Sequence, residues 1–392
     1  MSYLEEEKAF NKIIDDLMVL LKDEDSYNQV LSSMCSPPPE IAREIAKIFA
    51  TINLGDPGLF PETVKLENDV LAHLADLLHA PSSWTGAITS GGSESNLIGC
   101  WAARNWSKAN RGIEKGKIIF PESAHISFEK AADILNLETE WISLNENFQV
   151  DIEAVKEAID YRTVGIVGIA GATGTGVCDD INALSDLAID KNLYLHVDAA
   201  HGGTIYPYLK KLGYDVPIYG FENPGVKSVT IDTHKILGSL IPGGSIIFRS
   251  EEITKTIVKS ITYLSDSSTK QLTITGTRPG SSVIASWVLL KKLGESYILE
   301  RVKGSLKVTK YLVQRLKELP EIKLVFEPTL NIIGFTCNEM TNGDLMKELE
   351  QRGWHLSIYS NWIRIVVMPH VTKEVIDKFL NDLKSVINKE LL

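Results

Sequence analysis

Residues 193–203 read LYLHVDAAHGG. A mainly apolar run ends at Asp198 and is followed at once by small residues. Runs of this kind, with no polar face, are typical of strands that helices cover on both sides, as in a parallel sheet. Active sites in such sheets lie at the carboxyl ends of the strands. We therefore predict that Asp198 stands at the functional edge of a buried sheet.

Four further short apolar runs occur on either side of this strand and alternate with amphipathic helical segments. They are KIIF (117–120), VGIVGIA (164–170), SVTID (228–232) and GSIIF (244–248). The alternation, which extends from about Leu66 to Ser250, is typical of an α/β fold with a mostly parallel, doubly wound sheet. We expect this region to form the large domain of the protein.

The two ends of the chain have a different pattern. Residues 4–22 carry apolar positions at helical spacing, which predicts an amphipathic helix whose apolar face covers another surface. In an oligomer, that surface could belong to a neighbouring subunit. After a helical stretch at about 281–319, strand-like runs (IKLVF, NIIGFTC and WIRIVVM) and a last helix predict a smaller α+β domain. The predicted division is an N-terminal helical segment and loop (1–65), the large domain (66–280), and a linker helix with the C-terminal domain (281–392).

Composition narrows the class of protein. Of 392 residues, 44% are hydrophobic and 23% are charged, as in an ordinary soluble globular protein. The net charge of -11 and the lack of a basic patch argue against nucleic-acid binding. No uninterrupted apolar run reaches the ~20 residues of a membrane span, the N-terminus is acidic where a secretory signal would be basic, and four scattered cysteines fit a reducing compartment. We expect a cytoplasmic protein with no membrane segment and no metal site.

The strongest chemical signal is SVTIDTHK, residues 228–235, in which a strand is followed at once by His-Lys. A lysine amine just beyond a buried strand loses hydration, and desolvation favours the neutral amine. A neutral amine can attack an aldehyde. The tripeptide Thr-His-Lys is weak evidence on its own, since a surface lysine after a strand is the commoner case.

The presence of Asp198 supports a chemical role for this lysine. A buried, unpaired carboxylate at a strand end needs a cation or several hydrogen-bond donors. A protonated pyridine nitrogen is such a cation, and an Asp at that nitrogen together with a lysine bonded to the aldehyde is how proteins hold pyridoxal phosphate (PLP). A helix cap and a metal ligand are the alternative roles of Asp198.

A third element is TSGGSESN, residues 89–96, which leads into an apolar helix. Backbone amides at a helix N-terminus form an anion site, and glycines allow the backbone to approach a phosphate closely. The segment is neither a Walker motif nor GxGxxG. The order of the three elements, an anion loop, a strand-end Asp and a later Lys, is specific for a PLP enzyme.

With these motifs the sequence resembles the group II PLP-dependent decarboxylases of fold type I. It is most similar to the archaeal L-tyrosine/L-aspartate decarboxylase branch, in NLGDPGLFP (53–61), TGTRPG (275–280) and RIVVMPHVT (364–372). The likeness extends from about Cys35 to the C-terminus. It implies a large PLP-binding domain with a mostly parallel sheet of seven strands, a smaller C-terminal domain, and pyridoxal 5'-phosphate as the cofactor.

The resemblance implies a role for individual residues. Lys235 would bond to the cofactor aldehyde, Asp198 would keep the pyridine nitrogen protonated, and His125 would stack on the ring. Arg364 would bind the substrate α-carboxylate, with Asn53 as a further substrate contact. The other cofactor contacts that it implies are Ser90, Gly91, Gly92, Thr173, Ala200, Ser228, His234 and, reaching the phosphate of the neighbouring subunit, Gly276 and Thr277.

These roles imply the α-decarboxylation of an L-amino acid. The departing CO2 leaves its electrons in the cofactor ring, and Cα is then protonated, with Tyr263 of ITYLSD (261–266) as the candidate proton donor. The substrates implied are L-aspartate, which gives β-alanine, and L-tyrosine, which gives tyramine, with L-glutamate as a further candidate. The resemblance also implies a homodimer with its sites at the subunit interface.

Two positions depart from the family pattern. Ala172, in GATGTG (171–176), stands where the family usually has a threonine, and His201 follows Asp-Ala-Ala where the family often has an aromatic or another large residue. Both positions bear on substrate choice more than on cofactor binding.

Two other functions stay open at the level of sequence. A PLP-dependent carbon-carbon lyase of the sphingosine-phosphate-lyase type would share a segment like GTRPG (276–280), although such lyases usually carry a membrane anchor. A non-catalytic PLP-fold binding subunit is the second, and the presence of Lys235, Asp198, His125 and Arg364 together argues against it.

Overall fold

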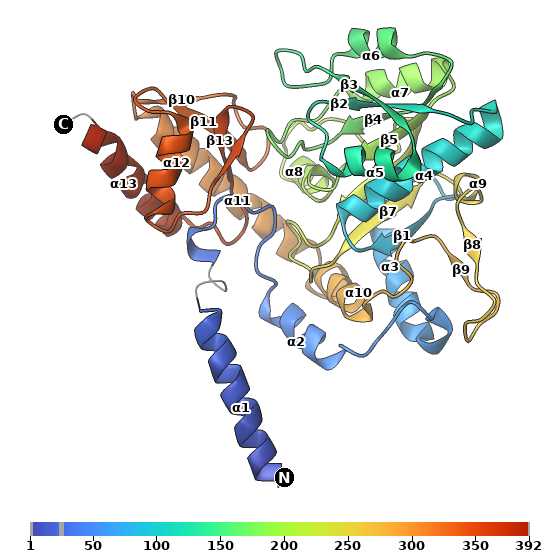
Figure 1. Ribbon diagram of the computed structural model, residues 1–392, viewed down its shortest axis with the longest axis horizontal. Helices are drawn as coiled ribbons and strands as arrows, with labels where there is room; N and C mark the ends of the chain where they lie inside the picture. Colours follow the sequence, from blue (N-terminus) through green and yellow to red (C-terminus); the bar gives the residue numbers. More distant parts are fainter. Residues whose placement is uncertain (1–2, 23–26, 391–392) are drawn as a thin grey trace.

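The computed structural model describes residues 3–22 and 27–390 (Figure 1). Its main body is a seven-stranded sheet with the strand order β1-β7-β6-β5-β4-β2-β3. In this sheet β7 runs antiparallel to both of its neighbours, and the other strands run parallel to one another. The predicted α/β fold with a mostly parallel seven-stranded sheet is confirmed. The strands are β1 (Thr85–Thr89), β2 (Lys117–Pro121), β3 (Glu138–Ile142), β4 (Thr163–Ile169), β5 (Tyr194–Asp198), β6 (Val226–Asp232) and β7 (Gly244–Phe248).

The five strands predicted from apolar runs all lie inside this sheet, and β2, β4, β5 and β7 are buried at every position. The sequence did not indicate β1 and β3. The strand β3 reads ETEWI and lies at an edge, where only its last residue is buried, so it carries no apolar run. The strand β1 is too short and too poor in large apolar side chains (TGAIT) to be told from a loop.

Helices cover both faces of the large sheet (Figure 1). The long helix α4 packs against β4 to β7 on one face and is joined there by α5, whereas α3, α7 and the short α8 contribute to the core on the other face. Asp151 and Asp180 cap the N-termini of α6 and α7 with their side chains. The helices of this region are α2 (Glu40–Ile48), α3 (Pro61–Leu77), α4 (Gly92–Arg111), α5 (Ser127–Leu135), α6 (Ile152–Ala158), α7 (Ile181–Asp190), α8 (Tyr206–Lys211) and α9 (Glu251–Thr254).

A second, antiparallel sheet forms the smaller C-terminal unit, with the order β10-β11-β13-β12. Its strands are β10 (Ile322–Leu324), β11 (Ile332–Cys337), β12 (Ser357–Tyr359) and β13 (Trp362–Val366). The helices α10 (Gly280–Trp287) and α11 (Gly294–Lys317) lead into it, and α12 (Asn342–Glu350) and α13 (Lys373–Glu390) pack with it. The predicted smaller α+β unit and linker helix are therefore present.

The division of the chain at residues 65 and 280 stays a prediction. Residue 65 falls inside α3, which is continuous from Pro61 and packs against α10, so a boundary near the start of that helix would agree better with the structure. Residue 280 coincides with the first residue of α10. A small hairpin of β8 (Lys259–Ser260) and β9 (Lys270–Gln271) projects from the large unit just before this point (Figure 1).

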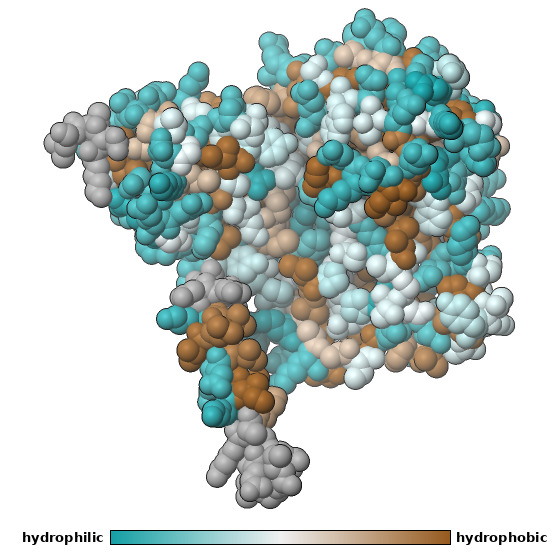
Figure 2. Space-filling view, viewed as in Figure 1, coloured by the Kyte–Doolittle hydropathy of each residue, from teal (hydrophilic) through white to brown (hydrophobic). Residues whose placement is uncertain are grey.

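The predicted N-terminal helix is α1 (Tyr3–Leu20), which extends away from the body of the molecule (Figure 1). Its apolar side chains gather on a surface that this chain leaves uncovered (Figure 2). Phe10 is 62% exposed, Met18 65% and Leu20 74%. No helix in the described ranges is both long enough and apolar enough to cross a membrane. Burial of this exposed face requires another surface.

Candidate active site

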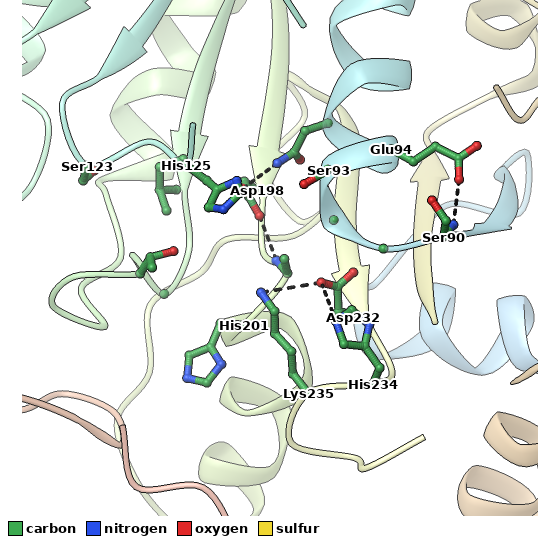
Figure 3. Close-up of a pocket in the computed structure, with 17 residues that line it drawn as sticks. Ser90, Ser93, Glu94, Ser123, His125, Asp198, His201, Asp232, His234 and Lys235 are labelled. Carbon is green, nitrogen blue, oxygen red and sulfur yellow. Dashed lines mark hydrogen bonds and ion pairs between the residues drawn. The ribbon is translucent and has the colours of Figure 1, made fainter. Parts of the chain in front are cut away.

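A cavity of about 270 Å³ opens at the carboxyl edge of the large sheet (Figure 3). Its walls come from the residues that follow β1 and β2 and from the last residues of β4, β5 and β6. This is the edge at which parallel sheets bind their ligands. The sequence therefore located the cavity correctly through Asp198, the last residue of β5.

Lys235 enters the cavity from a tight turn after β6. The backbone N–H groups of Thr233 and His234 both donate to the carbonyl of Gly243, and Gly238 closes the turn with φ 74°. The Lys235 side chain is 15% exposed, and its Nζ lies 3.5 Å from Oδ2 of Asp232. The amine is thus held in a mostly buried site next to a carboxylate, within reach of a molecule that enters the cavity (Figure 3).

Asp198 is held by two donors at the opposite wall of the cavity (Figure 3). Its Oδ2 accepts a hydrogen bond from Nδ2 of Asn96 at 2.8 Å, and its Oδ1 accepts one from the backbone N–H of Ala200 at 3.0 Å. The side chain is buried, with 8% of the residue exposed. Because both oxygens are oriented by the protein, the carboxylate presents a fixed negative charge to the cavity.

A chain of buried polar groups behind Asp198 orients this carboxylate. Asn96 uses Nδ2 for Asp198, so its Oδ1 accepts from His196 Nε2 (3.2 Å) and from the Thr230 hydroxyl (2.9 Å). His196 is then a neutral tautomer whose Nδ1 accepts from the Ser228 hydroxyl at 2.7 Å. Burial lowers the pKa of His196 to about 4, which keeps the imidazole neutral.

The loop after β1 brings Ser90, Gly91 and Gly92 to the cavity, at the N-terminus of α4. Gly91 has φ 135°, a conformation that favours glycine. Glu94 fixes the loop, because its Oε2 accepts the backbone N–H of Ser90 at 2.6 Å and its Oε1 accepts those of Ile274 and Thr275, both at 2.9 Å. Burial acts to raise the pKa of Glu94, but these hydrogen bonds outweigh it and the pKa is lowered. The helix start thus offers an ordered anion site.

The sequence of this chain matches a known protein family. Residues 41–338 match the model of the pyridoxal-dependent decarboxylase conserved domain. The chain belongs to the pyridoxal-dependent decarboxylase family. It is 44% identical to the L-aspartate/L-glutamate decarboxylase of Pyrococcus horikoshii over 93% of each chain, and 41% identical to the probable L-tyrosine/L-aspartate decarboxylase of Methanothermobacter thermautotrophicus, covering 92% of this chain and 98% of the relative.

Solved structures share the fold of this chain. The sphingosine-1-phosphate lyase of Burkholderia pseudomallei superposes with a TM-score of 0.89 at 27% identity, covering 96% of this chain and 90% of that one. The glutamate decarboxylase of Lactobacillus brevis superposes with a TM-score of 0.87 at 24% identity over 99% and 93% of the two chains, a likeness of fold. The protein is a pyridoxal-dependent amino-acid decarboxylase, and its cofactor is PLP.

The cavity of this decarboxylase fits PLP. The amine of Lys235, the carboxylate of Asp198 and the glycine loop at Gly91 line one cavity, where they match the aldehyde, the pyridine nitrogen and the phosphate of the cofactor. Three polar atoms of lining residues are buried without a hydrogen-bond partner in the described protein: Ser123 Oγ, His201 Nδ1 and Asp232 Oδ1. Buried polar atoms of this kind are normally satisfied, which indicates a polar ligand.

The structure brings most of the predicted cofactor residues of the decarboxylase into this cavity. Besides those described, His125, Thr173, Ala200 and His234 line it. His125 Nδ1 accepts the backbone N–H of Ser127 at 3.2 Å, and burial lowers the pKa of His125, so a neutral ring faces the cavity. Of the two departures from the family pattern, His201 lines the cavity and donates from Nε2 to Oδ1 of Asn331 (2.8 Å).

Ser228 requires a correction. It lies in the interior of β6, four residues before the strand end at Asp232, which places it about 13 Å back along the strand. It is fully buried, accepts from the Tyr194 hydroxyl at 2.9 Å and donates to His196. Because Ser228 does not line the cavity, it does not bind the phosphate as predicted but supports the chain of polar groups behind Asp198.

We predict that Ser228→Ala lowers the free energy of unfolding by ~1–3 kcal/mol, because His196 Nδ1 and the Tyr194 hydroxyl lose a buried partner. The variant should keep the wild-type preference for PLP over pyridoxal, which lacks the phosphate. Urea unfolding and cofactor titration measure the two quantities. A selective loss of PLP affinity, with pyridoxal affinity unchanged, would restore Ser228 as a phosphate contact.

Besides Ser228, five predicted residues do not line the cavity of a single chain. Arg364 lies next to it on β13, where its Nη1 donates to the carbonyl of Thr173, a lining residue, at 2.9 Å. Asn53 uses its Oδ1 to accept the N–H groups of Gly55 (2.8 Å) and Arg278 (3.3 Å), so it ties two loops together. The remaining three, Tyr263 (85% exposed), Gly276 and Thr277, lie on the surface.

Several functional residues were missed by the sequence reading. Asn96 and Asp232 lay within the quoted motifs but received no role, and Ser93, Glu94 and Ser123 also line the cavity. The position of Asp232, three residues before Lys235, could have indicated that it belongs to the site. The role of Asn96 depends on a contact with a residue 102 positions later, which no local pattern reveals.

Proposed function

We propose that this decarboxylase removes the α-carboxylate of L-aspartate to form β-alanine, with Lys235 as the lysine that bonds to PLP. The observation that supports this most strongly is the joint position of Lys235, Asp198 and the Gly91–Gly92 loop in one cavity. The choice of L-aspartate draws on relatives named as L-aspartate decarboxylases, such as that of Thermococcus kodakarensis at 44% identity. L-Tyrosine and L-glutamate are further substrate candidates, because other relatives carry those names.

Each residue contributes a distinct step. PLP, when bound, accepts the pair of electrons that the departing CO2 leaves behind. Asp198, fixed by Asn96 and the Ala200 N–H, holds a proton on the pyridine nitrogen and so stabilises this charge. Lys235 would hold the cofactor through its aldehyde before the substrate binds, and afterwards its amine would be free in the cavity to move a proton. The neutral ring of His125 covers one side of the cavity and excludes water from it.

Arg364 is proposed to bind the substrate α-carboxylate. Three of its five N–H groups are used, by Thr173 O (2.9 Å), Ser32 O (3.0 Å) and Ser357 Oγ (3.1 Å), so the guanidinium is fixed and two N–H groups remain for a ligand. Burial lowers the pKa of Arg364, as expected where water is excluded. A fixed two-donor fork suits a carboxylate.

We propose that the enzyme is a homodimer with its sites at the subunit interface. The exposed apolar face of α1 requires a covering surface, and Tyr263, Gly276 and Thr277 are exposed and free to meet a neighbouring subunit. Tyr263 is then the candidate proton donor to Cα. We also propose a cytoplasmic location, for which the four free cysteines of the chain are the support.

CO2 release from each of the twenty amino acids, with PLP supplied, tests the proposed substrate. We expect release from L-aspartate to exceed release from any other amino acid, with L-glutamate and L-tyrosine next. A preference for L-tyrosine would contradict the choice of an acidic substrate while leaving the reaction type intact. Equal rates for all amino acids would contradict a selective side-chain pocket.

A carbon-carbon lyase is the second candidate, and the TM-score of 0.89 with a sphingosine-1-phosphate lyase favours it. The two candidates differ in the bond that breaks. A lyase of that type would release no CO2 from any amino acid and would instead cleave a phosphorylated amino alcohol to an aldehyde. The CO2 panel therefore also separates these two reactions.

A further inference from the structure

Asp232 is a buried acid of the cavity to which the roles above give no task. It ends β6, and its side chain is 2% exposed. Oδ2 lies 3.5 Å from Lys235 Nζ and 3.9 Å from His234 Nε2, whereas Oδ1 is buried and has no hydrogen-bond partner in the described protein (Figure 3). Its two oxygens are therefore in very different environments.

The carboxyl group of Asp232 lies between two glycines. A Cβ atom on Gly92 would come 3.0 Å from Oδ2, and one on Gly244 would come 2.8 Å from Oδ1. Oδ2 is thus the oxygen that faces the anion loop and the lysine, and Oδ1 faces the backbone of β7.

These surroundings destabilise the ionised form of Asp232 relative to an exposed aspartate. An ionised carboxylate needs donors at both oxygens, and Oδ1 has none. Burial raises the pKa of Asp232, the charges of Lys235 and His234 act against this, and the nearby carboxylate of Asp198 adds to the increase. His125 faces the group across the cavity as a neutral ring, and Glu94 on α4 uses its carboxylate for Ser90 and residues 274–275.

Binding of the cofactor adds negative charge at this point. A phosphate monoester carries about −1.5 to −2 charges near pH 7, and the proposed function seats it at Ser90–Gly92, beside Oδ2 of Asp232. The positive groups near Asp232 are Lys235 and His234. The amine of Lys235 bonds to the cofactor aldehyde and is not available to the phosphate. Burial acts to lower the pKa of His234, but contact with the Cys35 thiol and the charge of Asp232 outweigh it and the pKa is raised. A single imidazolium does not neutralise both a carboxylate and a phosphate.

We propose that Asp232 takes up a proton from solvent when PLP binds and donates it, from Oδ2, to a phosphate oxygen. Cofactor loading is thereby coupled to pH. The inference rests on the proposed seating of the phosphate. A carboxylic acid in this position acts as a hydrogen-bond donor, whereas its conjugate base would repel the ligand. The affinity for PLP should therefore fall as pH rises above the range in which Asp232 can be protonated in the complex.

Calorimetric titration of the cofactor-free full-length protein with PLP, in buffers of different ionisation enthalpy, counts the protons taken up on binding. At pH 8 we expect the wild type to take up about one proton more than Asp232→Asn, which can donate a hydrogen bond but cannot ionise. Between pH 6.5 and 8.5 the wild-type affinity should fall more steeply than that of Asp232→Asn, by up to tenfold per pH unit. The ionisation of the phosphate in free PLP is common to both proteins and cancels in the difference.

Two controls sharpen the test. Pyridoxal lacks the phosphate, so wild type and Asp232→Asn should take up equal numbers of protons when they bind it. Asp232→Ser keeps a hydroxyl donor without an ionisable group and should behave like Asp232→Asn. Equal proton uptake by wild type and both variants with PLP would overturn the inference alone. Failure of the wild type to bind PLP would overturn the proposed seating of the phosphate as well.

Discussion

Replacement of Lys235 by alanine is expected to lower the rate of decarboxylation by ~10⁴-fold or more, on the scale seen when a covalent nucleophile is removed from an enzyme. Lys235 is the lysine among the lining residues of the cavity, so in the described protein no second amine is in place to bond to the cofactor aldehyde. The variant should also lose the visible absorption of the covalent cofactor–lysine linkage. Absorption spectra and CO2 release measure the two effects.

Lys191→Ala provides the matched control, because this exposed lysine follows α7 and pairs with Asp190 away from the cavity. It should leave both the spectrum and the rate within about twofold of the wild type, as expected for a surface ion pair. Retention of decarboxylation by Lys235→Ala at a tenth of the wild-type rate or more would contradict the assignment of the lysine.

Replacement of Asp198 by asparagine is expected to lower the rate by about 10²-fold or more, the scale on which loss of one electrostatic stabiliser acts. The side chain keeps its size, but its single amide oxygen can accept from only one of the two donors, Asn96 Nδ2 or the Ala200 N–H. What is lost is the negative charge that keeps the pyridine nitrogen protonated. The steady-state rate with saturating cofactor separates this effect from weaker PLP binding.

Asp180→Asn is a suitable control for Asp198→Asn. Asp180 caps α7 by accepting the backbone N–H of Ala183 at 3.0 Å, and asparagine caps helices about as well as aspartate. This control should show wild-type rates. If Asp198→Asn also kept the wild-type rate at saturating PLP, the charge of Asp198 would not be needed and its proposed role would be wrong.

The strands and site residues that could be predicted are those marked by their immediate neighbours in the sequence. Asp198 could be placed because a buried strand and the small residues after it are adjacent in sequence, and Lys235 because it directly follows β6. The large sheet was predictable for the same reason, since buried parallel strands are continuous apolar runs. The edge strand β3 lacks such a run and was missed.

Contacts between residues that are far apart in the sequence could not be predicted from it. The hydrogen bond of Asn96 to Asp198 joins α4 to β5 and depends on how the helix packs on the sheet. Ser228 was misassigned because nearness to Lys235 in sequence is not nearness in space when a strand separates the two. Tyr263, Gly276 and Thr277 lie on the surface of one chain, so their proposed roles depend on an assembly of two.

We propose above that this protein removes the α-carboxylate of L-aspartate. L-Aspartate labelled with ¹³C at carbon 1 or at carbon 4 tests it most directly, in the presence of PLP. We predict that labelled CO2 is released from carbon 1 and that the labelled carbon 4 remains in β-alanine. Labelled CO2 from carbon 4, with alanine as the product, or the absence of labelled CO2 from both substrates, would contradict the account.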